Sequence, residues 1–261
     1  MTADAEQAAL LASLPGWAFA AVLLMARVGC ACMLIPGIGE MEVPITVRAG
    51  FMLVLVTLLL PVVLPDLPSM PADAAHLGGM VAAEVFNGLW LGWLARMILL
   101  ALPMAGQIIA GAIGLTNVLQ PDAMLGAGAS ALQRLLGLSA PLLVLGSGLH
   151  AMPLEALAGS YRLVPAGTVL PAGDTVDAFV GSLAAAFGLG FRLAAPFLMA
   201  AVLFHVSLGL LGRLVPSLQT YFAAQPGQIL GGLLLLGLLG SAMVGVWMQA
   251  AEGSFAGLPG L

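Results

Sequence analysis

The chain has 261 residues, of which 61% are hydrophobic and only 7% are charged, and its mean hydropathy is +1.12. An average soluble domain carries about 25% charged residues, so this composition excludes a water-soluble protein of this length. The net charge of −5 comes from 12 acids and seven dispersed arginines, which excludes the clustered basic surface that binds nucleic acid. Continuous Leu-, Ala- and Gly-rich runs without alternation predict an all-α polytopic integral membrane protein.

Six apolar runs follow one another along the chain, separated by connectors rich in Pro, Gly and acidic residues. The fifth run is too long for one comfortable span, and we expect a single long, kinked or partly protruding helix there. The acidic N-terminus lacks the positively charged region of a secretory signal, so no cleaved signal is predicted. The six runs are residues 14–35, 45–64, 80–102, 132–157, 178–215 and 228–250.

The positions of the arginines predict the orientation in the membrane. With the N-terminus outside, Arg48, Arg134 and Arg213 lie at cytoplasmic helix ends, and only Arg162 lies in an outer connector. The positive-inside rule therefore favours an outside N-terminus.

Charged residues inside the apolar runs have two interpretations. Arg27, Glu84, Arg96 and Arg192 occupy such runs, where a central charge costs about 2.5–3.5 kcal/mol unless it is paired or hydrated. They could form a proton or ion path, or they could pair between subunits and set the register of an assembly, a role we also assign to Arg213. We favour pairing, because a relay needs carboxylates or histidines on neighbouring turns.

The sequence offers little basis for catalysis. His150 and Glu155 are five residues apart and miss the spacing that puts side chains on one helix face, and His205 lies between apolar residues. The sequence has no phosphate-binding glycine loop with lysine and no catalytic serine or metalloprotease motif. We predict that the chain is not an enzyme and uses no cofactor or metal ion.

The stretch 105–131 is apolar enough for a membrane, yet small and polar residues interrupt it as a helix. Pro121 removes a backbone donor and disfavours the α conformation at Gln120. Irregular backbone at membrane depth is tolerated only where protein buries it or where it lines a watery cavity. The stretch is therefore either an ordinary interhelical loop or a functional element.

The linear order of several motifs resembles the FliR family of flagellar biosynthetic export-gate proteins. Residues 26–51 carry the opening signature, with Arg27, Pro36, Val43, Pro44 and Arg48. Residues 105–123 are similar to the family's Gly-rich loop, with Pro121 here preceding Asp122. Later matches are a Gly-x-His at His150, a Ser-Tyr at Ser160, a Pro-x-Gly at Pro165, and an Arg-x-x-Pro at Arg213 and Pro216.

This resemblance implies a subunit of the type III secretion export gate in the bacterial inner membrane, within the flagellar basal body. The chain would form one export-gate domain, with residues 1–177 similar to FliP and the hairpin 178–261 similar to FliQ. The implied partners are FliP-like and FliQ-like gate subunits, an FlhB-like switch protein, membrane lipid and unfolded flagellar substrates. A virulence-type export gate, a secondary transporter and an intramembrane enzyme remain the alternatives.

By the same resemblance, the central interrupted stretch lines the axial pore and closes it as a plug. Residues 106–114 would supply the close-packed helix end that holds the plug. Gly permits unusual backbone angles and Met adapts its shape, which suits a seal that must part around a passing chain. The expected plug residues are Thr116, Asn117, Gln120, Pro121, Asp122, Met124, Leu125, Gly126 and Gly128.

Overall fold

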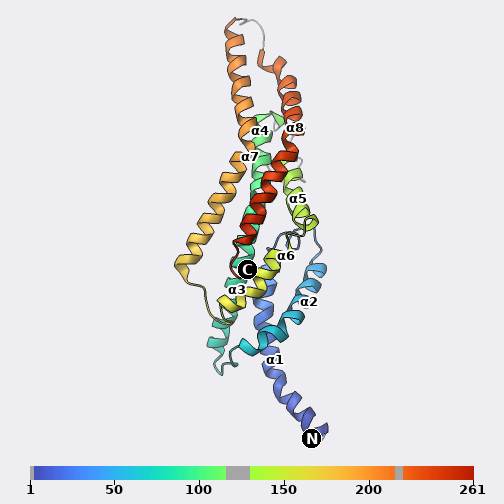
Figure 1. Cartoon of the computed structure of the whole chain (residues 1–261), viewed down its shortest axis with the longest axis vertical. Helices are drawn as coiled ribbons and strands as arrows, with labels where there is room; N and C mark the ends of the chain where they lie inside the picture. Colours follow the sequence, from blue (N-terminus) through green and yellow to red (C-terminus); the bar gives the residue numbers. More distant parts are fainter. Residues whose placement is uncertain (1–2, 116–129, 215–219) are drawn as a thin grey trace. The chain divides into compact units, whose positions relative to one another are not determined.

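The computed structural model describes residues 3–115, 130–214 and 220–261, and every regular element within them is a helix (Figure 1). Helix accounts for 83% of the structure. These ranges contain five helical stretches long and apolar enough to cross a membrane, and a sixth if one bent helix pair counts as a single span. The chain is therefore an all-α polytopic membrane protein, as predicted, and each helix satisfies its own backbone hydrogen bonds.

The helices follow the apolar runs with shifted ends. In chain order they are α1 (Ala3–Cys32), α2 (Ile45–Val63), η1 (Leu64–Asp66), α3 (Ala74–Met97), η2 (Ile98–Leu100), α4 (Ala101–Ala112), α5 (Ala131–Gly146), α6 (Ala151–Leu163), α7 (Ala172–Leu214) and α8 (Thr220–Ala256). The prediction of one long helix for the fifth run is confirmed, because α7 continues for 43 residues through Pro196.

The third run extends further than predicted. We predicted residues 80–102 for it, with a kink or an end at Pro103, but a short 3-10 turn joins α3 to α4, and the apolar stretch continues to Ala112. Pro103 lies in the first turn of α4. Amide groups in a first turn have no partner within the helix, so the missing proline donor costs little there.

The fourth run is broken where we predicted one helix. Its two halves, α5 and α6, are bent by 70°. Gly148 adopts φ +80° at the break, and its carbonyl accepts a hydrogen bond from the Ala151 amide. Glycine takes this left-handed conformation without steric cost, and so the Gly-Ser-Gly sequence ends α5.

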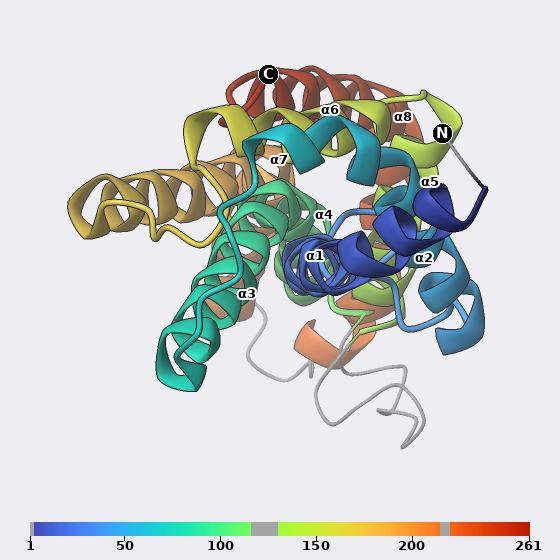
Figure 2. The same cartoon turned by 90° about the horizontal axis from the view of Figure 1, so that it is seen from below.

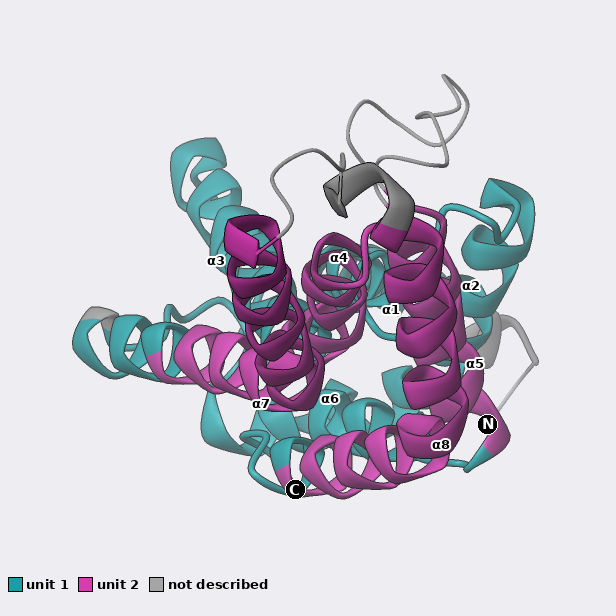
Figure 3. Cartoon of the chain, turned by 90° about the horizontal axis from the view of Figure 1, so that it is seen from above, with its two compact units in different colours: residues 1–96, 147–180, 254–261 teal, residues 97–146, 181–253 magenta. Residues whose placement is uncertain are grey.

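Contacts divide the chain into two compact units (Figure 3). Unit 1 consists of residues 1–96, 147–180 and 254–261, and unit 2 consists of residues 97–146 and 181–253. Each unit thus combines segments distant in sequence. The assignment of 1–177 and 178–261 to FliP-like and FliQ-like parts stays a prediction.

In unit 1, α1 and α3 lie side by side (Figure 2). The GxxxG face formed by Gly88 and Gly92 of α3 makes this contact, because Gly88 lies directly against the backbone of Arg27, and Gly92 lies against Ala31 and Leu34. A Cβ atom at Gly92 would come within 2.8 Å of the Leu34 Cβ. Small residues therefore set the distance between the two helices.

In unit 2, close packing of α8 uses Gly232 and not the Gly227–Gly231 pair, although that pair has GxxxG spacing. A Cβ atom added at Gly227 or Gly231 would have no described atom within 4 Å, whereas Gly232 packs directly against the Ile113 side chain. Trp247 is fully buried and donates a hydrogen bond to the Ile98 carbonyl at 3.1 Å. The Gly227–Gly231 face is therefore open within the described part of this chain.

The packing of α3 generates a test of the fold. We expect Gly88→Ala to destabilise the chain by about 1–3 kcal/mol, because the new methyl group overpacks the α1 backbone. Gly79→Ala, at an exposed position of the same helix with open space around it, should be neutral or stabilising. Thermal unfolding of the full chain in detergent measures both, and equal stability of the two variants would contradict the predicted helix contact.

Candidate functional site

A buried ion pair joins the first and third helices of unit 1. The Arg27 Nε donates to the Glu84 Oε2 at 2.7 Å, and Nη2 donates to Oε1 at 2.9 Å. Their side chains are 1% and 0% exposed. This bidentate geometry satisfies both charges, which is the condition for burying them in an apolar interior.

The pair extends to α6 and to the connector that follows it. The Arg27 guanidinium also donates to the Ser160 hydroxyl and to the Val164 carbonyl, and it lies 4.1 Å from the centre of the Tyr161 ring. The Gly167 amide donates to Glu84 at 2.7 Å. One buried cluster thus connects α1, α3, α6 and the turn around Pro165.

This cluster corrects our interpretation of Arg27 and Glu84. We predicted pairing between subunits, but the two residues pair with each other within one chain. The sequence contained a signal, because these are opposite charges in separate apolar runs. Glu84 is too far from Arg96 along their own helix for these two side chains to pair.

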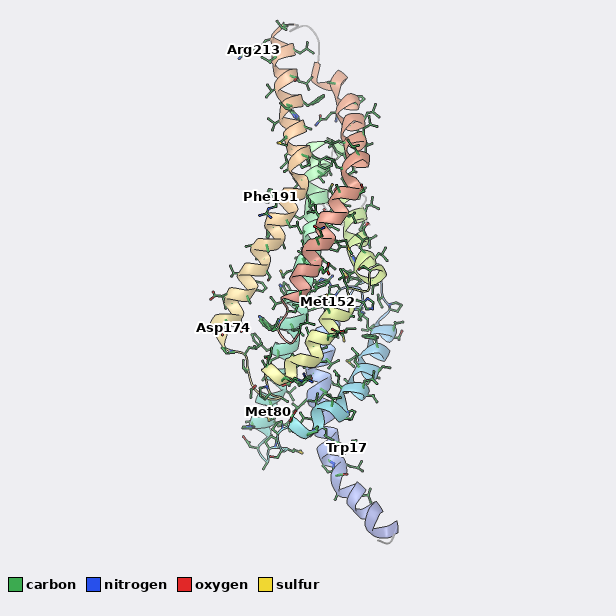
Figure 4. The ribbon with its side chains drawn as sticks, viewed as in Figure 1. Trp17, Met80, Met152, Asp174, Phe191 and Arg213 are labelled. Atoms are coloured by element: carbon green, nitrogen blue, oxygen red, sulfur yellow. The ribbon has the colours of Figure 1, made fainter. Side chains whose placement is uncertain are left out.

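The remaining predicted charges have different environments. Arg96 is 29% exposed, donates to Glu40 at 3.0 Å, and also donates to the Leu34 carbonyl. Arg192 and Arg213 are exposed in this chain, and neither forms an ion pair or hydrogen bond with a described residue, so their pairing with another subunit stays a prediction. Figure 4 labels both Arg213, in the last turn of α7, and Asp174, in the first turn of the same helix.

The family-motif positions form helix boundaries and turns. Pro36 is buried and precedes Gly37 at φ +85°, while Pro44 is the N-cap of α2. Arg48 lies in the first turn of α2, and its buried Nε has no hydrogen-bond partner in the described part. His150 occupies the N-cap position of α6 without a side-chain cap hydrogen bond. Pro216 lies outside the described residues.

The helix before the predicted plug ends at a well-defined anchor. Helix α4 ends at Ala112, and Gly114 adopts φ +79°. The Gln228 side chain of α8 donates to the Ala112 carbonyl at 2.9 Å. A polar side chain from another helix therefore satisfies a carbonyl at the end of α4, where the helix has no donor of its own.

Helix α5, which follows the predicted plug, is hydrogen-bonded at its start to the same helix α4. The Ser130 amide donates to the Gln107 side chain of α4 at 3.2 Å, and the Ser130 hydroxyl caps α5 by accepting from the Gln133 amide at 3.1 Å. A Cβ atom at Gly106 would come within 2.9 Å of the Gln133 Cα. Helices α4 and α5 thus hold the two flanks of the segment together.

The predicted plug residues themselves, Thr116 to Gly128, lie outside the described residues. Beside the anchor, unit 2 has an apolar pocket of about 330 Å³ between α7 and α8, lined by Ile113, Phe197, Phe204 and Gln228 among others. Gln228 supplies the only side-chain amide among these lining residues. The described lining of this pocket is therefore apolar apart from Gln228.

Comparison with known proteins agrees with the order of these features. The family model "Bacterial export proteins, family 1" matches residues 18–254. The chain is similar to the flagellar biosynthetic protein FliR of Caulobacter vibrioides, with 32% identity over 88% of this chain and 91% of the relative. It is also similar to FliR of Bacillus subtilis, with 27% identity over 82% and 83% of the two chains.

The matched region contains the buried ion pair, the turn at Pro36 and both flanks of the predicted plug. Because the match covers most of the chain, it concerns the whole arrangement and not one motif. This chain belongs to the FliR family of bacterial export proteins.

Proposed function

We propose that this chain is a pore-forming structural subunit of the flagellar type III protein export gate, through which unfolded flagellar proteins cross the inner membrane. Family membership supports the coarser statement that the chain is a component of the flagellar export apparatus. The finer proposal concerns the pore and its plug. In it, residues 116–128 close the pore until a substrate passes.

The observation that carries the plug proposal is the anchoring of both flanks of this segment. The Gln228–Ala112 bond fixes the end of α4, and the Ser130–Gln107 bond fixes the start of α5 beside it. Two rigid, adjacent attachment points suit a segment that must reach into a pore and return. A hydrophobic constriction can close a pore by excluding water, without chemistry of its own.

Exposed apolar surface supports assembly with other gate subunits. In the most apolar part of the α3–α4 stretch, 61% of the residues are buried. The corresponding share is only 17% in α7 and 11% in both α2 and α8. The open Gly227–Gly231 face and the exposed Arg192 are further places where partner helices could pack. We assign this surface to FliP-like, FliQ-like and FlhB-like neighbours in the basal body.

The proposal includes no enzymatic step. His150 and Glu155 belong to unit 1 and His205 to unit 2, and no described hydrogen bond or ion pair joins any two of them. The Nδ1 of His205 contacts the Ala201 carbonyl of its own helix at 2.7 Å. A secondary transporter would have corresponding broken helices in two halves, and the described residues contain one bent pair, α5 and α6.

Deletion of the proposed plug gives the first functional test. We expect the chain lacking residues 120–128 to co-purify with FliP-like and FliQ-like subunits, because the anchors of α4 and α5 remain, but to make the closed complex leak ions. Co-purification followed by imaging measures assembly, and conductance in planar bilayers measures the leak.

A milder variant controls for the deletion. Met124→Ser with Leu125→Ser should also increase conductance, whereas Met41→Ser, at a methionine that is 89% exposed in a turn, should not. Loss of complex formation without any leak in the deletion variant would show that the segment is an assembly element and not a plug.

The buried ion pair gives a second test, which separates structure from proton conduction. Arg27→Leu should destabilise the chain by about 3–5 kcal/mol, because Glu84 is left buried without its partner. The double change Arg27→Leu with Glu84→Leu should recover much of this loss, since it removes both charges. Thermal unfolding and proton flux into liposomes measure the two effects, and an unchanged stability with altered proton flux would favour a relay.

A further inference from the structure

Unit 1 contains a groove of about 370 Å³ that neither the ion pair nor the plug anchor explains. One wall is the C-terminal end of α2 with the short turn η1, and the other wall is α6. Four polar side chains line it, namely Asp66, Glu155, Tyr161 and Arg162. Its size lies within the usual range of small-molecule sites.

The charged side chains in this groove form no ion pair with one another. Asp66, Glu155 and Arg162 are exposed, and none of them forms an ion pair or hydrogen bond with a described residue. This contrasts with Arg27 and Glu84 of the same unit, which are paired. The groove therefore presents two negative groups and one positive group to whatever occupies it.

Tyr161 provides an independent indication of a ligand. Its side chain is 8% exposed, and its hydroxyl is buried without a hydrogen-bond partner in the described part of the chain. The contact between its ring and the Arg27 guanidinium fixes the ring in place. Leaving a buried hydroxyl unsatisfied is costly, and so an occupant of the groove that bonds to it would be favoured.

The groove lies at the end of a membrane-spanning stretch. The candidate span Ile45–Asp66 ends at one wall, and α6, the second half of the bent pair, ends one residue after Arg162. Leu58 and Val62 are each 64% exposed and lie one helical turn apart, leading from the groove along α2. Polar side chains with tyrosine above an apolar stripe are typical of the headgroup level of a bilayer.

We propose that this groove binds the headgroup of a zwitterionic phospholipid with a primary ammonium group, such as phosphatidylethanolamine. Arg162 binds the phosphate, while Asp66 and Glu155 accept hydrogen bonds from the ammonium. The Tyr161 hydroxyl donates to a phosphate or glycerol oxygen, and an acyl chain lies along Leu58 and Val62. This inference goes beyond the export role and does not depend on the plug.

The charge pattern selects this ligand among related ones. Two carboxylates disfavour a simple anion or an anionic headgroup, and the guanidinium disfavours a metal cation. A choline headgroup carries the same net charge but has no N–H donor for Asp66 and Glu155. The groove should therefore prefer an ethanolamine headgroup to a choline headgroup.

The test uses the full-length chain within its purified export complex, placed in phosphatidylglycerol nanodiscs. Added phosphatidylethanolamine should bind and raise the unfolding temperature more than phosphatidylcholine does, and native mass spectrometry counts the bound lipid. Arg162→Gln and Glu155→Gln should each weaken ethanolamine-lipid binding about tenfold or more, because each removes a charge-assisted bond. Tyr161→Phe should weaken lipid binding by a smaller factor, because it removes one uncharged hydrogen bond. The Tyr161 hydroxyl has no described partner within the chain, so this change breaks no internal hydrogen bond of the described part.

Matched variants outside the groove are Glu252→Gln on α8 and Arg134→Gln on α5, both at exposed positions, and both should bind the lipid like the wild type. Soluble phosphoethanolamine should compete only weakly, since it lacks acyl chains. Equal lipid affinity of the groove variants and the wild type would overturn the proposal. So would equal affinity for the choline lipid, or a partner polypeptide filling the groove in images of the complex.

Discussion

The burial of two opposite charges in an almost uncharged chain is the constraint on which unit 1 depends. Arg27 and Glu84 can remain ionised in an apolar interior only because each satisfies the other, and because Ser160, Val164 and Gly167 supply the remaining hydrogen bonds. These bonds determine which helices are neighbours. An arrangement that separated α1 from α3 would leave two unpaired charges in a place without water. We therefore expect the pair to act more on specificity of packing than on net stability, because well-packed apolar residues could give similar stability.

Small residues complement this constraint by letting the helices approach. Gly88 and Gly92 bring α3 onto α1 at the same level as the ion pair, and Gly106 brings α4 onto α5 in unit 2. Helices α2, α7 and α8 remain mostly uncovered, because few residues in their most apolar parts are buried. A membrane subunit with rigid internal contacts and uncovered apolar helices is suited to an environment of other subunits and lipids. The proposed roles, a gate component and a lipid-binding groove, both use surface that the chain does not cover itself.

The polar side chains of the described residues divide into those with an internal partner and those without one. Gln107 and Gln228 hold the flanks of the proposed plug, and Arg96 holds the turn before α2 through Glu40. In contrast, Arg192, Arg213 and the groove residue Arg162 extend from helices without an ion-pair partner in the described part. In so apolar a protein, an arginine at such a position is informative, because it requires water, lipid phosphate or a partner carboxylate.

The class of protein could be predicted from the residues alone, because hydropathy and the lack of charge depend only on composition. The positions of most helices and the family could be predicted too, since ordered motifs such as those at Arg27, Pro36 and Arg48 are local in sequence. The pairing of Arg27 with Glu84 rather than with another subunit required the folded chain, because the two residues are 57 positions apart. The same holds for the 70° break at Gly148, where a backbone angle interrupts an apolar run that hydropathy reads as continuous. Likewise, the groove beside Tyr161 combines residues from α2 and α6, and hydropathy measures the length of helices but not which of their faces meet.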